Sequence, residues 1–149
     1  GPRHPDIREI VHTHVSLTHK DNDVLAAADA TVRILAAVSL GAHLQEAILD
    51  EASQWISRAK ITRWTECADR VVVGGMLSSA CYIPDAFPAA LYLSYRHANK
   101  PADGICSNAQ CGGDSCHRGS VVGSLLAASS PLPEILIDRL VAAPRIINN

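Results

Sequence analysis

The stretch of sequence that decides the fold class is DNDVLAAADATVRILAAVSLG, residues 21–41. Asp21, Asn22 and Asp23 supply side-chain oxygens that can cap the N-terminus of a helix, and Gly41 suits the position just after its last turn. Between these ends, small and aliphatic side chains recur with helical spacing at Val24, Ala27, Ala28, Thr31, Leu35 and Val38. We therefore expect a helix here that lets its neighbours approach closely.

The same spacing of apolar side chains extends outward from this stretch in both directions. It predicts further helices over residues 5–17, 43–59, 85–98, 120–130 and 133–140. The β-branched run Val71, Val72 and Val73 has no second strand to pair with, so we interpret it as a buried connector. The sequence thus predicts an all-α fold of about six helices with no sheet.

Length and charge exclude several classes of protein. The chain has 149 residues, which suits one domain with a single core. Its formal net charge is -2 with both signs scattered, which argues against nucleic acid as a partner and against a basic membrane-binding surface. No apolar stretch reaches the roughly 18 residues that span a bilayer, so we expect no membrane partner.

The cysteines bear on the cellular compartment. The five cysteines are Cys67, Cys81, Cys106, Cys111 and Cys116. An odd number cannot all pair within one copy, so we expect reduced thiols and a cytoplasmic, intracellular setting. The start Gly1-Pro2 is typical of a cleaved tag, and these two residues are left out of the fold prediction.

A glycine-rich run, CGGDSCHRG at residues 111–119, is the strongest candidate for a functional site. Its two glycines allow a sharp turn, and Asp114, Cys116 and His117 offer carboxylate, thiolate and imidazole donors that can bind a metal. Cys106, Cys111 and Cys116 are five residues apart, which is not the paired spacing of a structural zinc site. Alternatively, Asp114 caps a helix, the cysteines are core thiols and His117 lies on the surface.

Four further residues are candidates for ligand contacts, each with a plainer alternative. His19 lies at a break between two predicted helices, where loop side chains are often presented to ligands. Tyr82 and Ile83 precede Pro84 and could cover a flat ligand face or simply belong to the core. Arg118 could bind a phosphate or carboxylate, or pair with an acidic neighbour on the surface.

Three segments together resemble the ADP-ribosylglycohydrolase family. They are SLTH at residues 16–19, YIPDAFPAALY at 82–92 and GGDSCHRG at 112–119, in the order and spacing of that family. The resemblance covers about residues 3–140 and looks like the C-terminal half of the family's all-α domain. It therefore implies a single domain over residues 3–149 with the shape of a compact orthogonal helical bundle.

The resemblance also implies a chemistry and a set of site residues. Proteins similar to this family hold two magnesium ions in a cleft and hydrolyse the glycosidic bond between ADP-ribose and an acceptor. Their metal motif reads Gly-Gly-Asp-Thr-Asp-Thr, so Asp114 matches the first Asp, while Cys116 and His117 replace the second Asp and the last Thr. The resemblance thus places metal ligands at Asp114, Cys116 and His117, and ligand contacts at His19, Tyr82 and Ile83. Sulfur and nitrogen donors should weaken magnesium binding sharply.

Two functions of different classes follow from the differences between this sequence and the family's motifs. Similar proteins take further metal ligands from a Thr-Asp-Asp segment, which these 149 residues lack. One reading is a metal-dependent hydrolase of ADP-ribosyl bonds that is weak or inactive as this chain alone. The alternative is an inactive derivative that binds ADP-ribose, an ADP-ribosylated protein, or a protein partner or second copy on an open apolar face.

Overall fold

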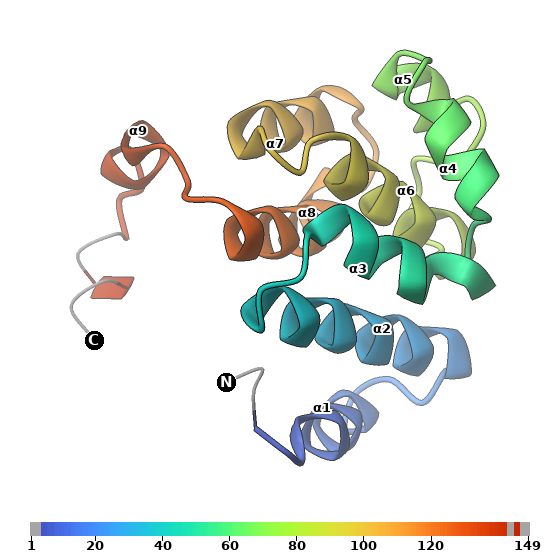
Figure 1. Ribbon diagram of the computed structural model, residues 1–149, viewed down its shortest axis with the longest axis vertical. Coiled ribbons are helices and arrows are strands. Elements are labelled where there is room, and N and C mark those ends of the chain that lie inside the picture. The colour runs from blue at the N-terminus through green and yellow to red at the C-terminus, as the bar shows by residue number, and fades with distance from the viewer. Residues whose placement is uncertain (1–3, 143–144, 147–149) are drawn as a thin grey trace.

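A computed structural model describes residues 4–142 and 145–146, and in these residues nine α-helices and one 3₁₀ helix form without a named strand (Figure 1). The helices are α1 (Ile7–Ser16), α2 (Asn22–Ser39), α3 (Leu44–Glu51), η1 (Ala52–Gln54), α4 (Arg58–Trp64), α5 (Asp69–Val72), α6 (Ile83–Arg96), α7 (Pro101–Gln110), α8 (Ser115–Ser129) and α9 (Glu134–Asp138). The predicted all-α helical bundle is confirmed.

Helix α2 forms where the sequence predicts it and for the predicted reason. Its N-cap residue, Asp21, accepts hydrogen bonds through Oδ1 from the backbone N–H groups of Asp23 (2.9 Å) and Val24 (3.2 Å). Its fully buried side chains are Ala27, Ala30 and Ile34. The buried face of α2 differs slightly from the predicted one, since Ala28 and Thr31 line a cavity instead of the core.

Helix α6 is the centre of the core. All eight residues from 87 to 94 are buried, and α2, α3, α7 and α8 pack around it. Small side chains such as Ala89 and Ala90 allow these neighbours to approach closely. The helix begins two residues earlier than expected because Pro84 suits its first turn, where a missing N–H costs nothing.

The helix predicted over residues 43–59 is wrong in its second half. Helix α3 ends at Glu51, η1 follows, and α4 starts after Ser57, whose hydroxyl accepts a hydrogen bond from the backbone N–H of Lys60 (3.3 Å). Trp55 lies in this break and packs edge-on against Phe87, with ring centroids 5.0 Å apart. Burial of the indole against the core and the serine cap therefore override the continuous apolar spacing.

Two short helices escape the sequence prediction. The connector expected at residues 71–73 is wrong in part, because Val71 and Val72 belong to α5 and Val73 follows it. Val72 and Val73 are buried as predicted, whereas Val71 is half-exposed. Helix α7 has no aliphatic stripe, since its buried residues are Pro101, Gly104 and Asn108. A Cβ on Gly104 would lie 2.5 Å from Leu126 Cδ1. Because glycine has no side chain, the backbone of α7 can pack directly against Leu126 of α8.

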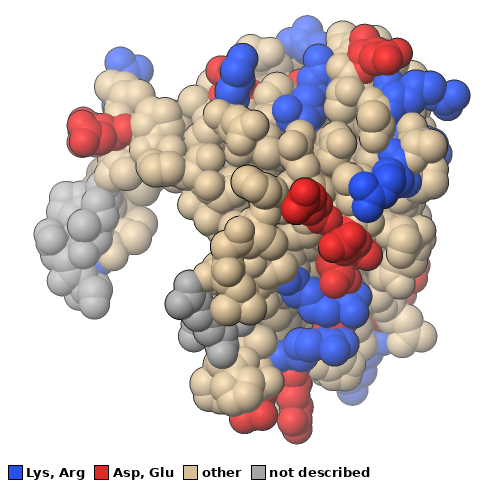
Figure 2. Space-filling view, viewed as in Figure 1, with Lys and Arg blue, Asp and Glu red and all other residues tan. Residues whose placement is uncertain are grey.

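The C-terminal segment leaves the bundle after α8. Helix α8 begins at Ser115, five residues before the expected start, and packs against α2, α6 and α7. Helix α9 stands apart from the other helices in Figure 1. On the face that Figure 2 shows, acidic and basic side chains are interspersed rather than gathered into one basic patch. Within the described residues, no helix is both long and apolar enough to cross a bilayer.

Candidate functional site

The glycine-rich run forms a tight loop between α7 and α8. Gly112 and Gly113 both adopt positive φ, at 67° and 64°, which glycine tolerates at little cost. The backbone N–H of Asp114 donates a hydrogen bond to the carbonyl oxygen of Ser79 (2.9 Å). A Cβ on Gly113 would lie only 2.1 Å from that same oxygen, so the loop over residues 112–114 lies directly against Ser79.

Arg118 and Asn108 hold this loop from inside the protein. Arg118 is 3% exposed, and its Nε donates a hydrogen bond to Oδ1 of Asn108 (2.7 Å). Its Nη2 donates to the carbonyl oxygens of Gly112 (2.8 Å) and Asn108 (3.1 Å), while Nδ2 of Asn108 donates to the carbonyl of Ser115 (2.9 Å). We call these bonds the Arg118–Asn108 clasp. The clasp places Asp114 at a fixed point because it bonds the backbone on both sides of that residue.

The carboxylate of Asp114 pairs with the ring of His117. Asp114 Oδ1 and His117 Nδ1 are 2.7 Å apart, with side chains 19% and 88% exposed respectively. The hydrogen bond from His117 lowers the pKa of Asp114 and outweighs the opposing effect of its desolvation. Asp114 occupies the N-cap position of α8, as the alternative interpretation expects; its carboxylate bonds the ring of His117, and the backbone of His117 also lowers its pKa.

A cavity of about 350 Å³ opens beside this pair, between α1, α2, α6 and α8. Its walls are mostly apolar and come from the following residues: Val11, Ala27, Ala28, Thr31, Val32, Cys81, Ile83, Ala86, Phe87, Ala90 and Val121. Asp114, His117 and Arg118 complete the lining at one edge. The site therefore combines an apolar chamber with one carboxylate, one imidazole and one guanidinium, as small-molecule sites commonly do.

The structure brings together some of the predicted site residues and not others. Ile83, Asp114 and His117 line the same cavity, although 31 positions separate Ile83 from Asp114. Tyr82 is 71% exposed and Cys116 is exposed, and neither is among the residues that line the cavity. His19 is also exposed, and its Nδ1 lies 2.9 Å from the hydroxyl oxygen of Thr18. Arg118, left open between a ligand and a surface role, is buried at the edge of the cavity.

The donor set at this cavity does not by itself fit magnesium. Mg²⁺ demands several oxygen donors in near-octahedral geometry, and Asp114 supplies the one carboxylate in the lining. Among residues 4–142 and 145–146, no three His, Cys, Asp or Glu side chains lie together so as to hold a metal ion. The assignment of Asp114, Cys116 and His117 as metal ligands stays a prediction that requires further oxygen donors.

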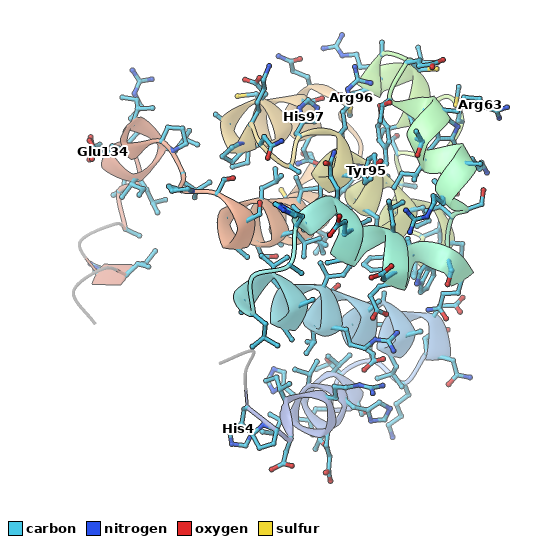
Figure 3. All side chains as sticks on the ribbon, viewed as in Figure 1. His4, Arg63, Tyr95, Arg96, His97 and Glu134 are labelled. Atoms are coloured by element: carbon cyan, nitrogen blue, oxygen red, sulfur yellow. The ribbon has the colours of Figure 1, made fainter. Side chains whose placement is uncertain are left out.

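A second polar cluster, missed by the sequence, surrounds Asp69. Its carboxylate accepts hydrogen bonds from Tyr92 Oη (2.8 Å), His97 Nε2 (2.8 Å) and Ser107 Oγ, and lies 3.3 Å from Arg96 Nε. Burial alone would raise the pKa of Asp69, but these bonds and the guanidinium hold it well below its ordinary value. Figure 3 shows Arg96 and His97 at the end of α6, between α5 and α7.

This Asp69 cluster is a structural junction rather than a nucleophilic site. A nucleophilic triad needs a serine hydroxyl bonded to the histidine, whereas Ser107 and His97 both donate to the carboxylate. The cluster instead ties α5, α6 and α7 together. This cluster could not be predicted from the sequence, because Asp69 and Ser107 lie on the two short helices that the apolar spacing did not predict.

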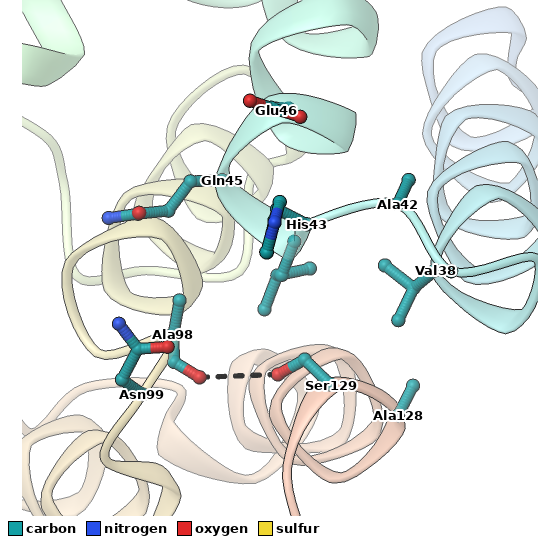
Figure 4. Close-up of a pocket in the computed structure, with 11 residues that line it drawn as sticks. Val38, Ala42, His43, Gln45, Glu46, Ala98, Asn99, Ala128 and Ser129 are labelled. Carbon is teal, nitrogen blue, oxygen red and sulfur yellow. Dashed lines mark hydrogen bonds between the residues drawn. The ribbon is translucent and has the colours of Figure 1, made fainter.

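A larger and more polar cavity lies at the other end of α8. It measures about 550 Å³, and its polar lining includes His43, Gln45, Glu46, Asn99 and Ser129 (Figure 4). The Ser129 hydroxyl donates to the carbonyl oxygen of Ala98 (3.2 Å), the bond drawn in Figure 4. None of the predicted metal-binding or ligand-binding residues lines this cavity. The cavity beside Asp114 is therefore the better candidate.

Comparison with known proteins identifies the family of the chain. No curated protein and no solved structure matches the chain. A family model described as ADP-ribosylglycohydrolase matches residues 2–144, which include both the Ile83 and the Asp114 segments. That family is generally metal-dependent and acts on ADP-ribosylated substrates. Because the match spans nearly the whole sequence, the chain belongs to the ADP-ribosylglycohydrolase family.

Proposed function

We propose that this chain binds ADP-ribose, free or attached to a protein, in the cavity beside Asp114, and that alone it hydrolyses the glycosidic bond weakly or not at all. One observation carries the proposal. Two segments that resemble family motifs, at residues 82–92 and 112–119, meet at one cavity through Ile83, Asp114 and His117. If the chain used the family's fold only as a scaffold, it would not need a cavity between these two segments.

The chemistry of the cavity supports a nucleoside-like ligand. A volume of about 350 Å³ is within the usual range for small-molecule pockets. The apolar walls from α2 and α6 suit a flat ring, since burial of apolar surface is favourable and needs no polar partner. The carboxylate of Asp114, which accepts a hydrogen bond from His117, can also accept hydrogen bonds from ribose hydroxyls.

The donor set supports the expectation of weak hydrolysis. In a two-metal site, paired cations polarise the bond and activate water, and each needs several hard donors. Here Asp114 is the carboxylate at the cavity, and the exposed Cys116 and His117 offer softer sulfur and nitrogen donors. Asp114 would hold the metal if other oxygen donors joined it. This chain's own residues bind and orient the ligand.

The proposal is tested by calorimetric titration with ADP-ribose, with and without magnesium. Ala28 lines the cavity, so Ala28→Phe should fill it and abolish binding. Ala127 is an exposed residue of the neighbouring α8, and Ala127→Phe is the matched control that should leave binding unchanged. If the wild-type chain gives no heat, or if both variants bind equally well, the cavity is not the ADP-ribose site.

A second assay distinguishes binding from hydrolysis. Release of free ADP-ribose from an ADP-ribosylated protein, measured with magnesium present, should be slow or undetectable for the chain alone. Rapid release that disappears in Asp114→Ala would instead support the hydrolase interpretation. His19 and Tyr82 stay predicted ligand contacts, and His19→Ala and Tyr82→Ala test them by their affinity for ADP-ribose.

The remaining predictions concern partners and location. A homodimer or a protein partner on an open apolar face is proposed as the alternative function, and sedimentation of the purified chain over a range of concentrations tests the dimer. The single-domain boundaries at residues 3–149 and the cytoplasmic location stay predictions of the sequence.

A further inference from the structure

Arg118 carries an unsatisfied hydrogen-bond donor inside the protein. The Arg118–Asn108 clasp uses Nε and Nη2, whereas Nη1 is buried and has no hydrogen-bond partner among the described residues. An unpaired buried donor costs free energy, and most such groups in native proteins have a partner. An unsatisfied guanidinium nitrogen at the edge of a cavity therefore needs an explanation.

The charge of Arg118 is also poorly compensated. Among the described residues, no carboxylate lies within ion-pair distance of its guanidinium, so the alternative of a surface pair with an acidic neighbour is wrong. Cys111 and Asp114 are the nearby groups that act on it electrostatically. Burial raises the pKa of the Cys111 thiol, and the Asp114 carboxylate is already hydrogen-bonded to His117. Burial lowers the pKa of Arg118, as expected for a cation removed from water.

The position of Arg118 indicates what would compensate it. Arg118 is among the residues that line the cavity, together with Asp114 and His117, and the rest of the lining is mostly apolar. Interactions between charges are stronger in such surroundings than in water. The planar guanidinium suits the oxygens of a phosphate or carboxylate, with which it forms short charge-assisted hydrogen bonds.

We propose that Arg118 is an anion-binding residue of the cavity and that Nη1 donates a hydrogen bond to a phosphate or carboxylate group of the bound ligand. The identity of that ligand rests on the proposed function, in which the anion is a phosphate of ADP-ribose. Because Nη1 is buried, an anion reaches it only when the surrounding side chains move.

The anion site is tested apart from ADP-ribose by nuclear magnetic resonance of the chain labelled with ¹⁵N-arginine. The guanidinium signal of Arg118 is assigned by its loss in Arg118→Lys. Addition of pyrophosphate should shift this signal, and addition of succinate tests a carboxylate in the same way. A shift with either anion supports the proposal and identifies the anion. No shift with both anions overturns it, whether or not ADP-ribose binds.

Calorimetry with matched ligands gives a second readout. ADP-ribose should bind the wild-type chain roughly tenfold or more tightly than adenosine, and Arg118→Met should remove most of this preference. Arg63→Met is the control, since it makes the same substitution at an exposed arginine that does not line the cavity, and it should keep the preference. Equal binding of adenosine and ADP-ribose to the wild-type chain would overturn the phosphate assignment while leaving the cavity as the ligand site.

Discussion

Replacement of Asp69 by asparagine should cost a large part of the stability of the protein. The side chain of Asp69 is 13% exposed and accepts hydrogen bonds from Tyr92, His97 and Ser107, with Arg96 Nε 3.3 Å away. Asparagine has nearly the same shape, but its NH₂ group would face two of these donors and its charge is lost. Two charge-assisted bonds, each contributing about 1.5–3 kcal/mol, then disappear.

The expected loss in the free energy of unfolding is about 3–5 kcal/mol, the range seen when one partner of a buried ion pair is removed. The Ser107 hydroxyl can rotate to accept a bond from the new amide, which favours the lower end of that range. Urea unfolding at pH 7, followed by circular dichroism, measures the difference. Asp50→Asn is the matched control, because that side chain is 75% exposed and lies 3.8 Å from Arg58, so its loss should change stability little.

The pH dependence of the same difference identifies its cause. Because the folded protein lowers the pKa of Asp69, its stabilisation is fully present above the unfolded pKa of about 3.9. It is lost as the pH falls from there through the lower folded value. The gap between the wild-type protein and Asp69→Asn should therefore close as the pH is lowered below about 4. A gap under about 1 kcal/mol at pH 7, or one independent of pH, would refute the reasoning.

Two further predictions concern the glycine-rich loop. Gly113→Ala should destabilise the protein more than Gly112→Ala in urea unfolding, because its Cβ would lie 2.1 Å from Ser79 O, whereas nothing is within 4 Å at Gly112; the positive φ alone costs about 1–2 kcal/mol at either position. His117→Ala should raise the pKa of Asp114 toward its ordinary value, because the ring's hydrogen bond is lost, as a ¹³C carboxyl titration would measure.

Each of these two predictions has an outcome that contradicts it. Equal destabilisation by the two glycine variants would mean that the loop can move away from Ser79 without cost. An unchanged pKa of Asp114 in His117→Ala would mean that backbone groups or Arg118 control that carboxylate. Circular dichroism of each variant confirms first that the helical content is unchanged.

The fold could be predicted where an apolar stripe or a capping residue specifies a helix. Helix α2 forms with the Asp21 cap that its sequence indicates. Helix α7 could not be found in this way, because its contact surface is made by Gly104 and Asn108 rather than by aliphatic side chains. The break at Trp55 was missed for a different reason, since only the folded protein contains the Phe87 ring against which the indole packs.

The site was predictable in part for similar reasons. Sequence motifs identified Asp114, His117 and Ile83, and the structure brings these three residues to one cavity. The role of Arg118 could not be chosen from the sequence, because a buried and a surface arginine look alike there. Its hydrogen bonds to Asn108 and Gly112 depend on how α7 and α8 pack, which is a tertiary property.

Helix α6 has a consequence for how this protein can change over evolution. Its first turn supplies Ile83 to the cavity and its last turn supplies Arg96 to the Asp69 cluster, about 20 Å away for a 14-residue helix. A substitution that adapts the cavity to a new ligand must leave the position of α6 unchanged. Otherwise it also disturbs the Asp69 cluster at the other end of the helix. Among related proteins, changes in ligand preference should therefore accompany changes in thermal stability. The two properties should change independently only through side chains that are not on α6, such as His117 on α8.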